Sequence, residues 1–457
     1  MYAVGAAVLL VTTAVLVGRH IQETRHTLRV GWPPVLGSWE PHVGPGTPAA
    51  GIVAILTLAY GPALAARLPW RALLTLAWGT STAWTLSLAL IDGWQRGIAA
   101  RLTTRNEYLQ VIDRFHDIPA ALGDFTHHIL IQSPDNWPAH VAGHPPAATL
   151  TFVLLDRIGL RGGGWAGIWC ITVGATACAA VLVAIRALAD ERSARRAAPF
   201  LVLAPAAVWM GTSADAYFAA VAAWAVALLA LAVTRGSLPA AGAAGLLSGL
   251  TCYLSYGLTL FALIGAAVLW LGRDRLRGRP VLLIPLLAGA AVVPAAFTLA
   301  GFDWWEAYHL LVTRYYQGAG GVRPYSYWVW ANLACTVLIT GPATAAGLRR
   351  TGAVLTRGRG RGEFEGGKAE PAERRGAGPV LDPADAGTRL ALLVAAALLA
   401  LLIADLSGMS KAETERIWLP FAMWLLPACA FLPRPRAWLT AQAVLALLLN
   451  HLLMTGW

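Results

Sequence analysis

The stretch GGWAGIWCITVGATACAAVLVAIRAL, residues 163–188, contains a single charged residue, Arg186, close to its end. About 20 apolar residues in a helix are enough to cross the hydrocarbon core of a bilayer. Similar runs recur along the 457-residue chain, which is 57% hydrophobic and 13% charged, whereas soluble domains carry about 25% charged residues. The sequence therefore predicts an all-α fold, a polytopic helical transmembrane bundle of about 13 spans, within a range of about 12 to about 14.

The apolar runs are separated by charged loops, which set the boundaries of the expected spans. The run 238–272 is too long for one crossing, and Ser255-Tyr256-Gly257 interrupts it, so we expect a hairpin of two short helices there. The expected spans are Tyr2–Gly18, Ala49–Leu68, Trp70–Ile91, Gly163–Leu188, Ala197–Met210, Ala216–Val233, Leu238–Tyr253, Gly257–Leu271, Pro280–Gly301, Tyr327–Leu348, Arg389–Ala404, Ile417–Phe431 and Ala437–Met454.

Arginine clusters alternate with loops that hold few of them from Gly163 onward. The positive-inside rule places the clusters in the cytoplasm and the intervening loops outside. The outer loops hold Asp215, Phe302–Ser326 and Asp405–Arg416. We therefore expect a multi-pass protein of the plasma membrane. Its net charge of +11 reflects these cytoplasmic clusters, so the expected partner is the lipid bilayer and not a nucleic acid.

The first half of the topology depends on His144–Leu160, whose apolar part is short for a span. If this segment does not cross, loop 92–162 lies outside and the chain has about thirteen spans. If it crosses, the loop is cytoplasmic and there are about fourteen. The arginines near the first spans slightly favour the second arrangement.

Composition divides the chain into three parts. Residues 1–348 form the main transmembrane bundle with loop 92–162, and residues 389–457 form a three-helix transmembrane segment. Between them, residues 349–388 are rich in Gly, Arg, Glu and Pro and cannot bury enough apolar surface to become ordered. We expect a disordered cytoplasmic linker there.

Loop 92–162 carries a polar island, NEYLQVIDRFHDIPAAL, at residues 106–122. Its acids are Glu107, Asp113 and Asp117, and Asp92 precedes it at the end of the third span. On a helix, Asp113 and Asp117 would share a face. A carboxylate beside a cavity at the bilayer surface can take a proton from an incoming hydroxyl as general base. The alternative is a solvated charged loop.

The loop ends in PDNWPAHVAGHPP, residues 134–146, where Pro-Pro fixes the entry to a short apolar helix. His140 and His144 lie in this segment. With other histidines of the loop they could hold a divalent cation such as Mg²⁺ or Mn²⁺, although the spacing defines no site and no cofactor is certain.

Further charged residues are expected at the outer face. Asp215, in the turn between two spans, is either a solvated turn residue or part of a site with the loop acids. The outer cations suit the phosphate of a lipid-linked substrate, or they are ordinary anchors that extend to the interface. These cations are Arg314, Arg323, Lys411 and Arg416.

This arrangement resembles the GT-C glycosyltransferases. The resemblance rests on a long outer loop after an early span, which begins with acids and ends in GHPP, and on a second acid, Asp215, ten residues after Pro205. It covers mainly Trp70–Val233 and the turn Asp405–Arg416. A paired acidic motif directly after Asp92 is absent, and the nearest following acid is Glu107. The resemblance implies that the loop lies outside, and we therefore adopt the thirteen-span arrangement.

The resemblance also implies an activity. Such an enzyme would move a sugar, mannose-like or arabinose-like, from a polyprenyl-phosphate carrier to an envelope glycan, lipid or protein. An acid, Asp92, Glu107 or Asp215, would deprotonate the acceptor. Substrate would be bound by Asp113, Asp117, His140, His144 and the four outer cations. The Ala/Arg/Gly-rich composition suggests an actinobacterial source. The alternatives are a transporter or flippase, and a non-catalytic envelope scaffold.

Overall fold

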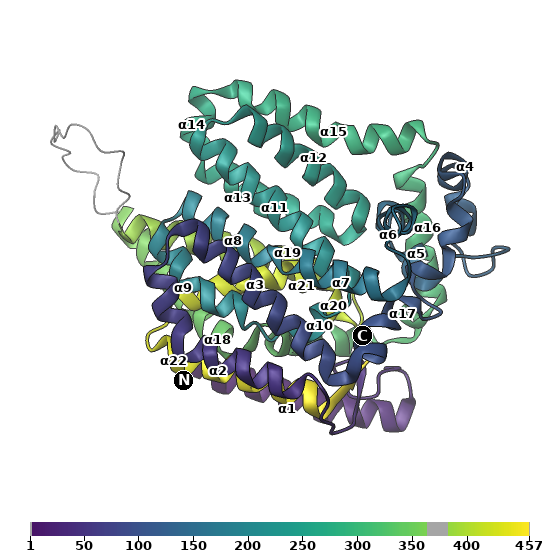
Figure 1. The fold of residues 1–457 in the computed structure, drawn as a ribbon, viewed down its shortest axis with the longest axis horizontal. Helices are drawn as coiled ribbons and strands as arrows, with labels where there is room; N and C mark the ends of the chain where they lie inside the picture. Colours follow the sequence, from purple (N-terminus) through teal and green to yellow (C-terminus); the bar gives the residue numbers. More distant parts are fainter. Residues whose placement is uncertain (1, 363–382, 457) are drawn as a thin grey trace.

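A computed structural model describes residues 2–362 and 383–456 of the chain. It is a bundle of helices, most of which run broadly along one direction (Figure 1), so the predicted all-α polytopic fold is confirmed. Within the described residues, eight helical segments are long and apolar enough to cross a membrane, and three shorter apolar segments accompany them.

The long segments are α1 (Tyr2–Arg25), α2 (Thr47–Arg67), α3 with η1 (Trp70–Ala89 and Leu90–Asp92), α7 with α8 (Gly162–Gly174 and Thr176–Leu188), α11 (Ala214–Arg235), η7 with α15 (Pro280–Leu282 and Leu283–Leu299), α18 (Tyr325–Gly362) and α19 (Pro383–Leu406). The shorter ones are α12 (Leu238–Leu254), η6 with α13 (Tyr256–Leu260 and Phe261–Leu271) and α21 with η8 (Leu419–Leu425 and Leu426–Phe431). The short helix α14 (Arg273–Gly278) follows α13.

Two further expected spans take a different form. One is α9 (Glu191–Val202) followed by α10 (Ala207–Met210), and the other is α22 (Pro435–Leu452). Pro205 lies in the break between α9 and α10, where its missing N–H and fixed φ disfavour a continuous helix. The hairpin expected at residues 238–272 is present as α12 and α13.

The segment on which the span count depends forms α6 (Ala147–Arg157), a helix of 11 residues. At 1.5 Å per residue, such a helix is about 16 Å long, roughly half the thickness of the hydrocarbon core. Figure 1 shows α6 nearly end-on, across the direction of the long helices. Its length and orientation favour the arrangement in which it does not cross.

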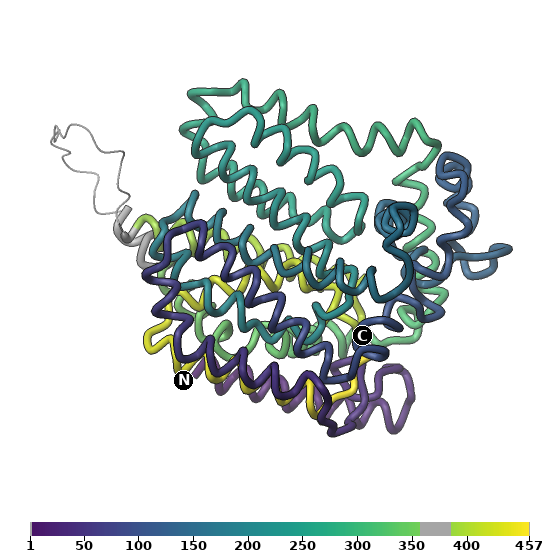
Figure 2. The backbone as a smooth tube through the Cα atoms, viewed as in Figure 1, coloured from purple at the N-terminus to yellow at the C-terminus, as the bar shows by residue number. Residues whose placement is uncertain are grey.

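The rest of loop 92–162 consists of short helices gathered at one end of the bundle with the segment after α15, as Figures 1 and 2 show. The short helices of the loop are η2, a π-helix (Gln95–Ala99), η3 (Arg101–Thr103), η4 (Tyr108–Phe115), α4 (Ile118–Gly123), η5 (Phe125–His128) and α5 (Ala139–Gly143). Three helices from later in the chain lie at the same end: α16 (Trp304–Gln317), α17 (Ala319–Val322) and α20 (Thr414–Ile417).

The described parts of the expected linker are helical. Helix α18 continues through a kink at Gly341 as far as Gly362, and α19 begins at Pro383. Extending an existing helix is much easier than starting one, so the span before residue 349 carries the helix into the charged segment. Residues 363–382 lie outside the described part. The C-terminal helices pack into the main bundle, since α21 contacts α11, and α22 contacts α2.

A short antiparallel pair of strands adds to the helical fold. Strand β1 (Gly37–Trp39) pairs with β2 (Leu453–Thr455), with Gly37 opposite Thr455. The pair ties the end of the chain to the segment between α1 and α2. It therefore lies beside the end of the bundle that carries the short helices (Figure 1).

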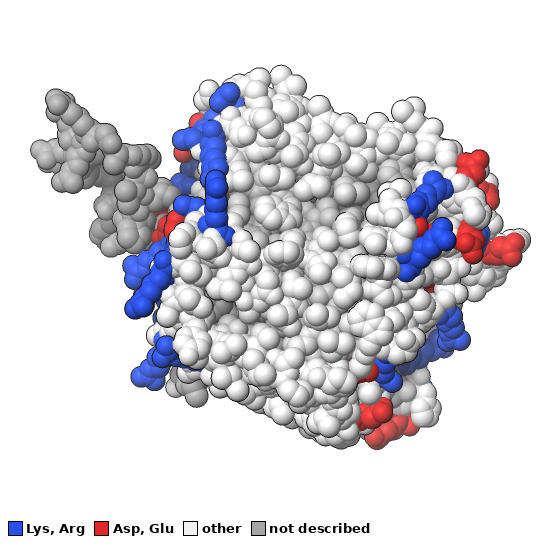
Figure 3. All heavy atoms as spheres, viewed as in Figure 1, with Lys and Arg blue, Asp and Glu red and all other residues white. Residues whose placement is uncertain are grey.

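The charges are distributed unevenly between the two ends. Figure 3 shows mostly Lys and Arg, with a few acids, at the end where α14 lies, whereas acids are more prominent beside the basic residues at the opposite end, where α4 and α5 lie. This distribution matches the alternation in the sequence. By the positive-inside rule, the end with α14 is predicted to face the cytoplasm.

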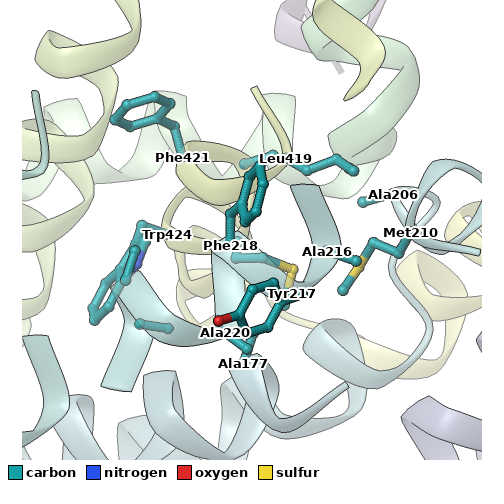
Figure 4. Close-up of a cluster of buried hydrophobic side chains, with 14 of the residues drawn as sticks. Ala177, Ala206, Met210, Ala216, Tyr217, Phe218, Ala220, Leu419, Phe421 and Trp424 are labelled. Atoms are coloured by element: carbon teal, nitrogen blue, oxygen red, sulfur yellow. The ribbon is translucent and has the colours of Figure 1, made fainter. Parts of the chain in front are cut away.

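The core is organised around α11. In the most apolar 18-residue window of this helix 83% of residues are buried, compared with 17% for α1 and 6% for the segment that contains α15. Figure 4 shows Tyr217 and Phe218 of α11 among Leu419, Phe421 and Trp424 of α21. Alanines along α11 let neighbouring helices approach closely. The first turn of α11 is therefore held rigidly inside the protein.

Candidate active site

Four ionisable side chains from three distant segments meet at the end of the bundle with the short helices. Glu107 Oε1 lies 2.8 Å from His140 Nδ1, and His140 Nε2 lies 3.3 Å from Arg416 Nη2. Arg416 Nη1 in turn donates to Asp215 Oδ2 at 2.5 Å. All four residues are buried, with exposed fractions between 3% and 9%. We call them the buried charge cluster.

Asp215 occupies the first turn of α11. Ser213 is the N-cap of this helix: its Oγ accepts from the Asp215 N–H and donates to Asp215 Oδ2, both at 3.2 Å. Thr212, at a φ of 64°, donates its hydroxyl to the carbonyl of Gly97 at 2.7 Å. An acid is favoured at a helix N-terminus by the helix dipole. The rigid core helix therefore fixes the carboxylate that faces Arg416.

Arg416 is presented by α20, directly after a strained turn. Ala412 and Glu413 have φ values of 72° and 63°, a region that costs non-glycine residues about 1–3 kcal/mol each. Asn332 of α18 holds the turn, since its Nδ2 donates to the carbonyl of Ser410 at 2.6 Å. Burial lowers the pKa of Arg416, but the nearby negative charges, those of Asp215, Glu413 and Glu107 among them, together outweigh burial and hold that pKa above its usual range.

Glu107 and His140 come from opposite ends of loop 92–162. The backbone N–H of His140 donates to the carbonyl of Asn106 at 3.0 Å, which brings the two segments together. Beside them, His144 Nδ1 lies 2.7 Å from the His140 carbonyl and 3.1 Å from the hydroxyl of Tyr108. Burial lowers the pKa of His144 to about 4 and raises the pKa of Tyr108 well above its usual value. Both side chains are therefore neutral near pH 7.

A cavity of about 20 Å³ lies against the cluster. Its volume is sufficient for about one water molecule, so entry of a sugar or lipid requires the lining segments to separate. The lining residues come from the loop, from the turn before α11, from α20 and from the C-terminal segment. They are Arg101, Leu102, Glu107, Tyr108, Thr212, Ser213, Ala214, Arg416 and Gly456.

Asp92 contacts Arg101, one of the residues that line this cavity. Its Oδ2 accepts from Arg101 Nη2 at 2.8 Å, and its Oδ1 lies 2.9 Å from His42 Nε2. Arg101 faces the same cavity as Arg416. The two lining arginines are thus each supported by an acid, Arg101 by Asp92 and Arg416 by Asp215. Of the three acids expected to act in catalysis, Glu107 lines the cavity itself.

Two other predicted acids lie apart from the cluster. Asp113 and Asp117 are both exposed, and the expectation that they share one helix face is wrong. Asp113 belongs to the 3₁₀-helix η4, which ends at Phe115, whereas Asp117 is the N-cap of α4 and accepts from the Ala120 N–H at 3.1 Å. Capping is a sufficient role for an aspartate at this position.

The remaining predicted cations hold backbone carbonyls. Arg314 donates to the carbonyls of Ile129 and Trp137. Arg323 donates to Leu28 and Lys411 carbonyls, and Lys411 Nζ donates to the carbonyl of Gly320 at 2.9 Å. The interpretation of the outer cations as exposed anchors is wrong for Arg323, Lys411 and Arg416, which are 5–9% exposed. The helices around them supply carbonyl or carboxylate acceptors, which permits burial of a charge.

The described residues contain no group of three or more His, Cys, Asp or Glu side chains arranged to hold a metal ion. Within the cluster, Glu107 is turned to His140, and Asp215 to Arg416. The donor set therefore does not fit the divalent cation considered from the sequence, and we derive no step through one.

Sequence reasoning missed Arg101, Tyr108 and Ser213. Arg101 lies six residues before Glu107 in the same loop, which was a usable signal. The inward orientation of its side chain depends on Asp92 and on the carbonyl of Thr455, to which its Nη1 donates at 3.3 Å. A partner more than 350 positions away along the chain leaves no local pattern.

Comparison with known proteins gives a weak likeness. A crystal structure of the Archaeoglobus fulgidus oligosaccharyltransferase, tethered to an acceptor peptide with an NVT sequon through a disulfide bond, matches with a TM-score of 0.43 and 13% identity over 79% of this chain and 49% of that one. A second crystal structure of the same enzyme, in complex with Zn and sulfate, matches with a TM-score of 0.41 and 14% identity over 83% of this chain and 53% of that one. The chain thus spans about half the length of these structures. No protein-family model and no curated protein matches the sequence. At these TM-scores the likeness assigns neither family nor activity.

Proposed function

We propose that this protein is an integral-membrane glycosyltransferase of the GT-C type. It would transfer a sugar from a polyprenyl-phosphate carrier to an acceptor of the cell envelope, at the outer face of the cell membrane. The observation that carries the proposal is the cavity at the buried charge cluster, where Glu107 faces two arginines, Arg101 and Arg416. The motif resemblance of loop 92–162 and Asp215 supports the same activity.

The arrangement suits attack by a hydroxyl on a sugar phosphate. The acceptor oxygen forms a bond to the anomeric carbon, the bond from that carbon to the phosphate oxygen breaks, and the phosphate leaves with its electron pair. The proton of the acceptor passes to the carboxylate of Glu107, for which a base within hydrogen-bond reach is required. The negative charge that grows on the departing phosphate is stabilised by Arg101 and Arg416, which are already oriented.

The other members position these groups. Asp92 and Asp215 orient the two guanidinium groups through contacts of 2.8 Å and 2.5 Å. His140 lies between Glu107 and Arg416 and holds the carboxylate at the cavity wall. Most of the rate enhancement would come from this fixed geometry and charge, as in other sites that stabilise a leaving phosphate electrostatically.

On this proposal the structure would correspond to a closed form of the site, because its cavity has room for about one water. Gly456, next to β2, lines the cavity, and β2 pairs with β1 over three residues. We propose that this C-terminal segment moves away when the lipid-linked donor enters.

The test is a transfer assay with purified protein, a labelled polyprenyl-phosphate sugar and a membrane extract as acceptor. Glu107→Gln keeps shape and removes the base, so we expect transfer to fall by about 10²-fold or more. Asp113→Asn is the matched control, because it makes the same change at an exposed acid of the same loop, and it should leave transfer unchanged. Full activity of Glu107→Gln, or transfer from a nucleotide sugar without a lipid carrier, would contradict the proposal.

A further inference from the structure

A second and much larger cavity lies at the opposite end of the protein from the buried charge cluster. It has a volume of about 700 Å³ and lies between α2, α9 and the start of α22. This is the end predicted from the arginine distribution to face the cytoplasm. Four arginines line it, Arg192, Arg195, Arg196 and Arg434, with Glu191 as the acid among the lining residues.

Two of these arginines are fixed by the fold. Arg195 donates to the carbonyls of Ala65 and Leu68 at the end of α2 and is paired with Glu191 at 2.6 Å. Arg196 Nη2 donates to the carbonyl of Leu432 at 3.0 Å. Their guanidinium groups therefore form a rigid wall, and little ordering is needed when an anion binds.

Among the described residues that line the cavity, four arginines face a single acid, Glu191. Glu191 also pairs with Arg186, at 2.7 Å, so its single charge is shared. Among the described residues, no carboxylate lies within 4.0 Å of Arg192, Arg196 or Arg434. Burial, together with the charges of Arg192 and Arg350, lowers the pKa of Arg196. An anion in the cavity would relieve this repulsion.

The rest of the lining is apolar. Pro62, Pro199, Phe200 and Leu432 face the same space as the arginines. A free phosphate would leave this surface uncovered, whereas a lipid would place its headgroup phosphate on the guanidinium groups and an acyl chain along the apolar wall. Basic pockets between helices on the cytoplasmic side of membrane proteins bind anionic headgroups in this way, and guanidinium groups bind phosphate oxygens through paired hydrogen bonds.

We propose that this arginine-lined cavity binds one anionic phospholipid of the inner leaflet, at a site separate from the buried charge cluster. The proposal does not depend on the transfer activity.

The experiment measures lipid binding by native mass spectrometry of the detergent-solubilised protein. Titration with dioleoylphosphatidylglycerol should show one binding site. Its dissociation constant should be at least tenfold lower for this lipid than for dioleoylphosphatidylcholine. The double variant Arg192→Gln with Arg434→Gln should weaken the binding of phosphatidylglycerol at this site about tenfold or more. It should leave the binding of phosphatidylcholine unchanged. The matched control is Arg235→Gln with Arg277→Gln, which removes the same charge from exposed positions outside the cavity and should change binding less than twofold.

A second variant keeps every arginine. Ala66 is exposed on the lining, so Ala66→Trp fills the apolar side, and it too should weaken phosphatidylglycerol about tenfold. Equal binding of the two lipids by the unmodified protein would overturn the proposal. So would an equal loss of phosphatidylglycerol binding in the double variant of the cavity arginines and in the control double variant. If sn-glycerol 3-phosphate binds as tightly as the lipid, the occupant is a soluble phosphate and the lipid assignment fails.

Discussion

Two acids of loop 92–162, Glu107 and Asp124, contact imidazole rings at nearly equal distances in very different surroundings. Glu107 and His140 lie 2.8 Å apart, with side chains 9% and 11% exposed. Asp124 lies 2.6 Å from His127 and 2.8 Å from His128, and its side chain is 57% exposed. Contact length alone therefore does not distinguish a reactive pair from a surface pair.

What differs is enclosure and the neighbouring charge. The Glu107–His140 contact continues to Arg416 and Asp215 in a region largely shielded from solvent, where charges interact more strongly than in water. The Asp124 contacts are local: hydrogen bonds from His127 and His128 lower the pKa of Asp124, and solvent screens the rest. The predictions below test whether this difference decides stability and activity.

The largest effect is expected at the buried ion pair. Asp215→Asn or Arg416→Gln leaves one charge buried without its partner, so each should lower the free energy of unfolding by about 3–5 kcal/mol. The double variant Asp215→Asn with Arg416→Gln removes both charges and should recover most of that loss, while transfer stays abolished. Thermal unfolding in detergent, together with the transfer assay, measures both quantities. Losses that simply add in the double variant would show that the two residues are not coupled.

The second prediction concerns pH. Burial holds the pKa of His144 near 4, below the value of about 6.5 in an unfolded chain. The folded state therefore binds fewer protons than the unfolded state between these values. The contribution of His144 to the free energy of unfolding is therefore fully present above about pH 6.5. It is lost, by about 3 kcal/mol, as the pH drops to about 4. Unfolding temperatures measured at several pH values should show this fall, and His144→Asn should reduce it.

The matched control for the pH series is His127→Asn in the exposed set. His127 is 73% exposed and lies outside the buried charge cluster. We expect the pH profile of this variant to follow the unmodified protein. An equal change in both variants would mean that the acid sensitivity arises elsewhere in the protein.

These contrasts show how far the sequence could lead. The apolar runs predicted the helical bundle, the α12–α13 hairpin and the short α6, because hydrophobic length is a local property of the chain. Glu107, His140, Asp215 and Arg416 were each predicted as candidates. A site shared by Asp215 and the loop acids was one of two alternatives. The contacts of Arg416 with Asp215 and His140 were not predicted, because they depend on α20 and α11 meeting in three dimensions.

The failures have the same origin. The alternative that Arg323 and Lys411 are ordinary anchors extending to the interface ignored carbonyls that come from distant segments, Leu28 and Gly320. Asp113 and Asp117 looked like a pair only if one α-helix continued through both. The chain instead changes from η4 to α4 between them, and Pro119 near the start of α4 suits the first turn of a new helix.

A third, smaller effect is expected at Arg101, the lining arginine supported by Asp92. Arg101→Lys retains the charge but replaces two fixed donors by one mobile ammonium group. We expect transfer to fall about tenfold, with the free energy of unfolding changed by less than about 1 kcal/mol. Arg96→Lys is the control, because Arg96 also approaches Asp92, at 3.8 Å, but is half exposed. Equal activities of the two variants would remove Arg101 from the site.

The smallest effect is expected at Asp124. Asp124→Asn abolishes the charge in both surface contacts while keeping a side chain that can still accept a hydrogen bond from one histidine. Solvent-exposed ion pairs contribute little because water and salt screen them, so the free energy of unfolding should change by no more than about 0.5 kcal/mol, and less at high salt. Transfer should be unchanged. A loss comparable with that of Glu107→Gln would show that Asp124 takes part in the reaction, and burial could then no longer be the property that separates the Glu107 contact from the Asp124 contacts.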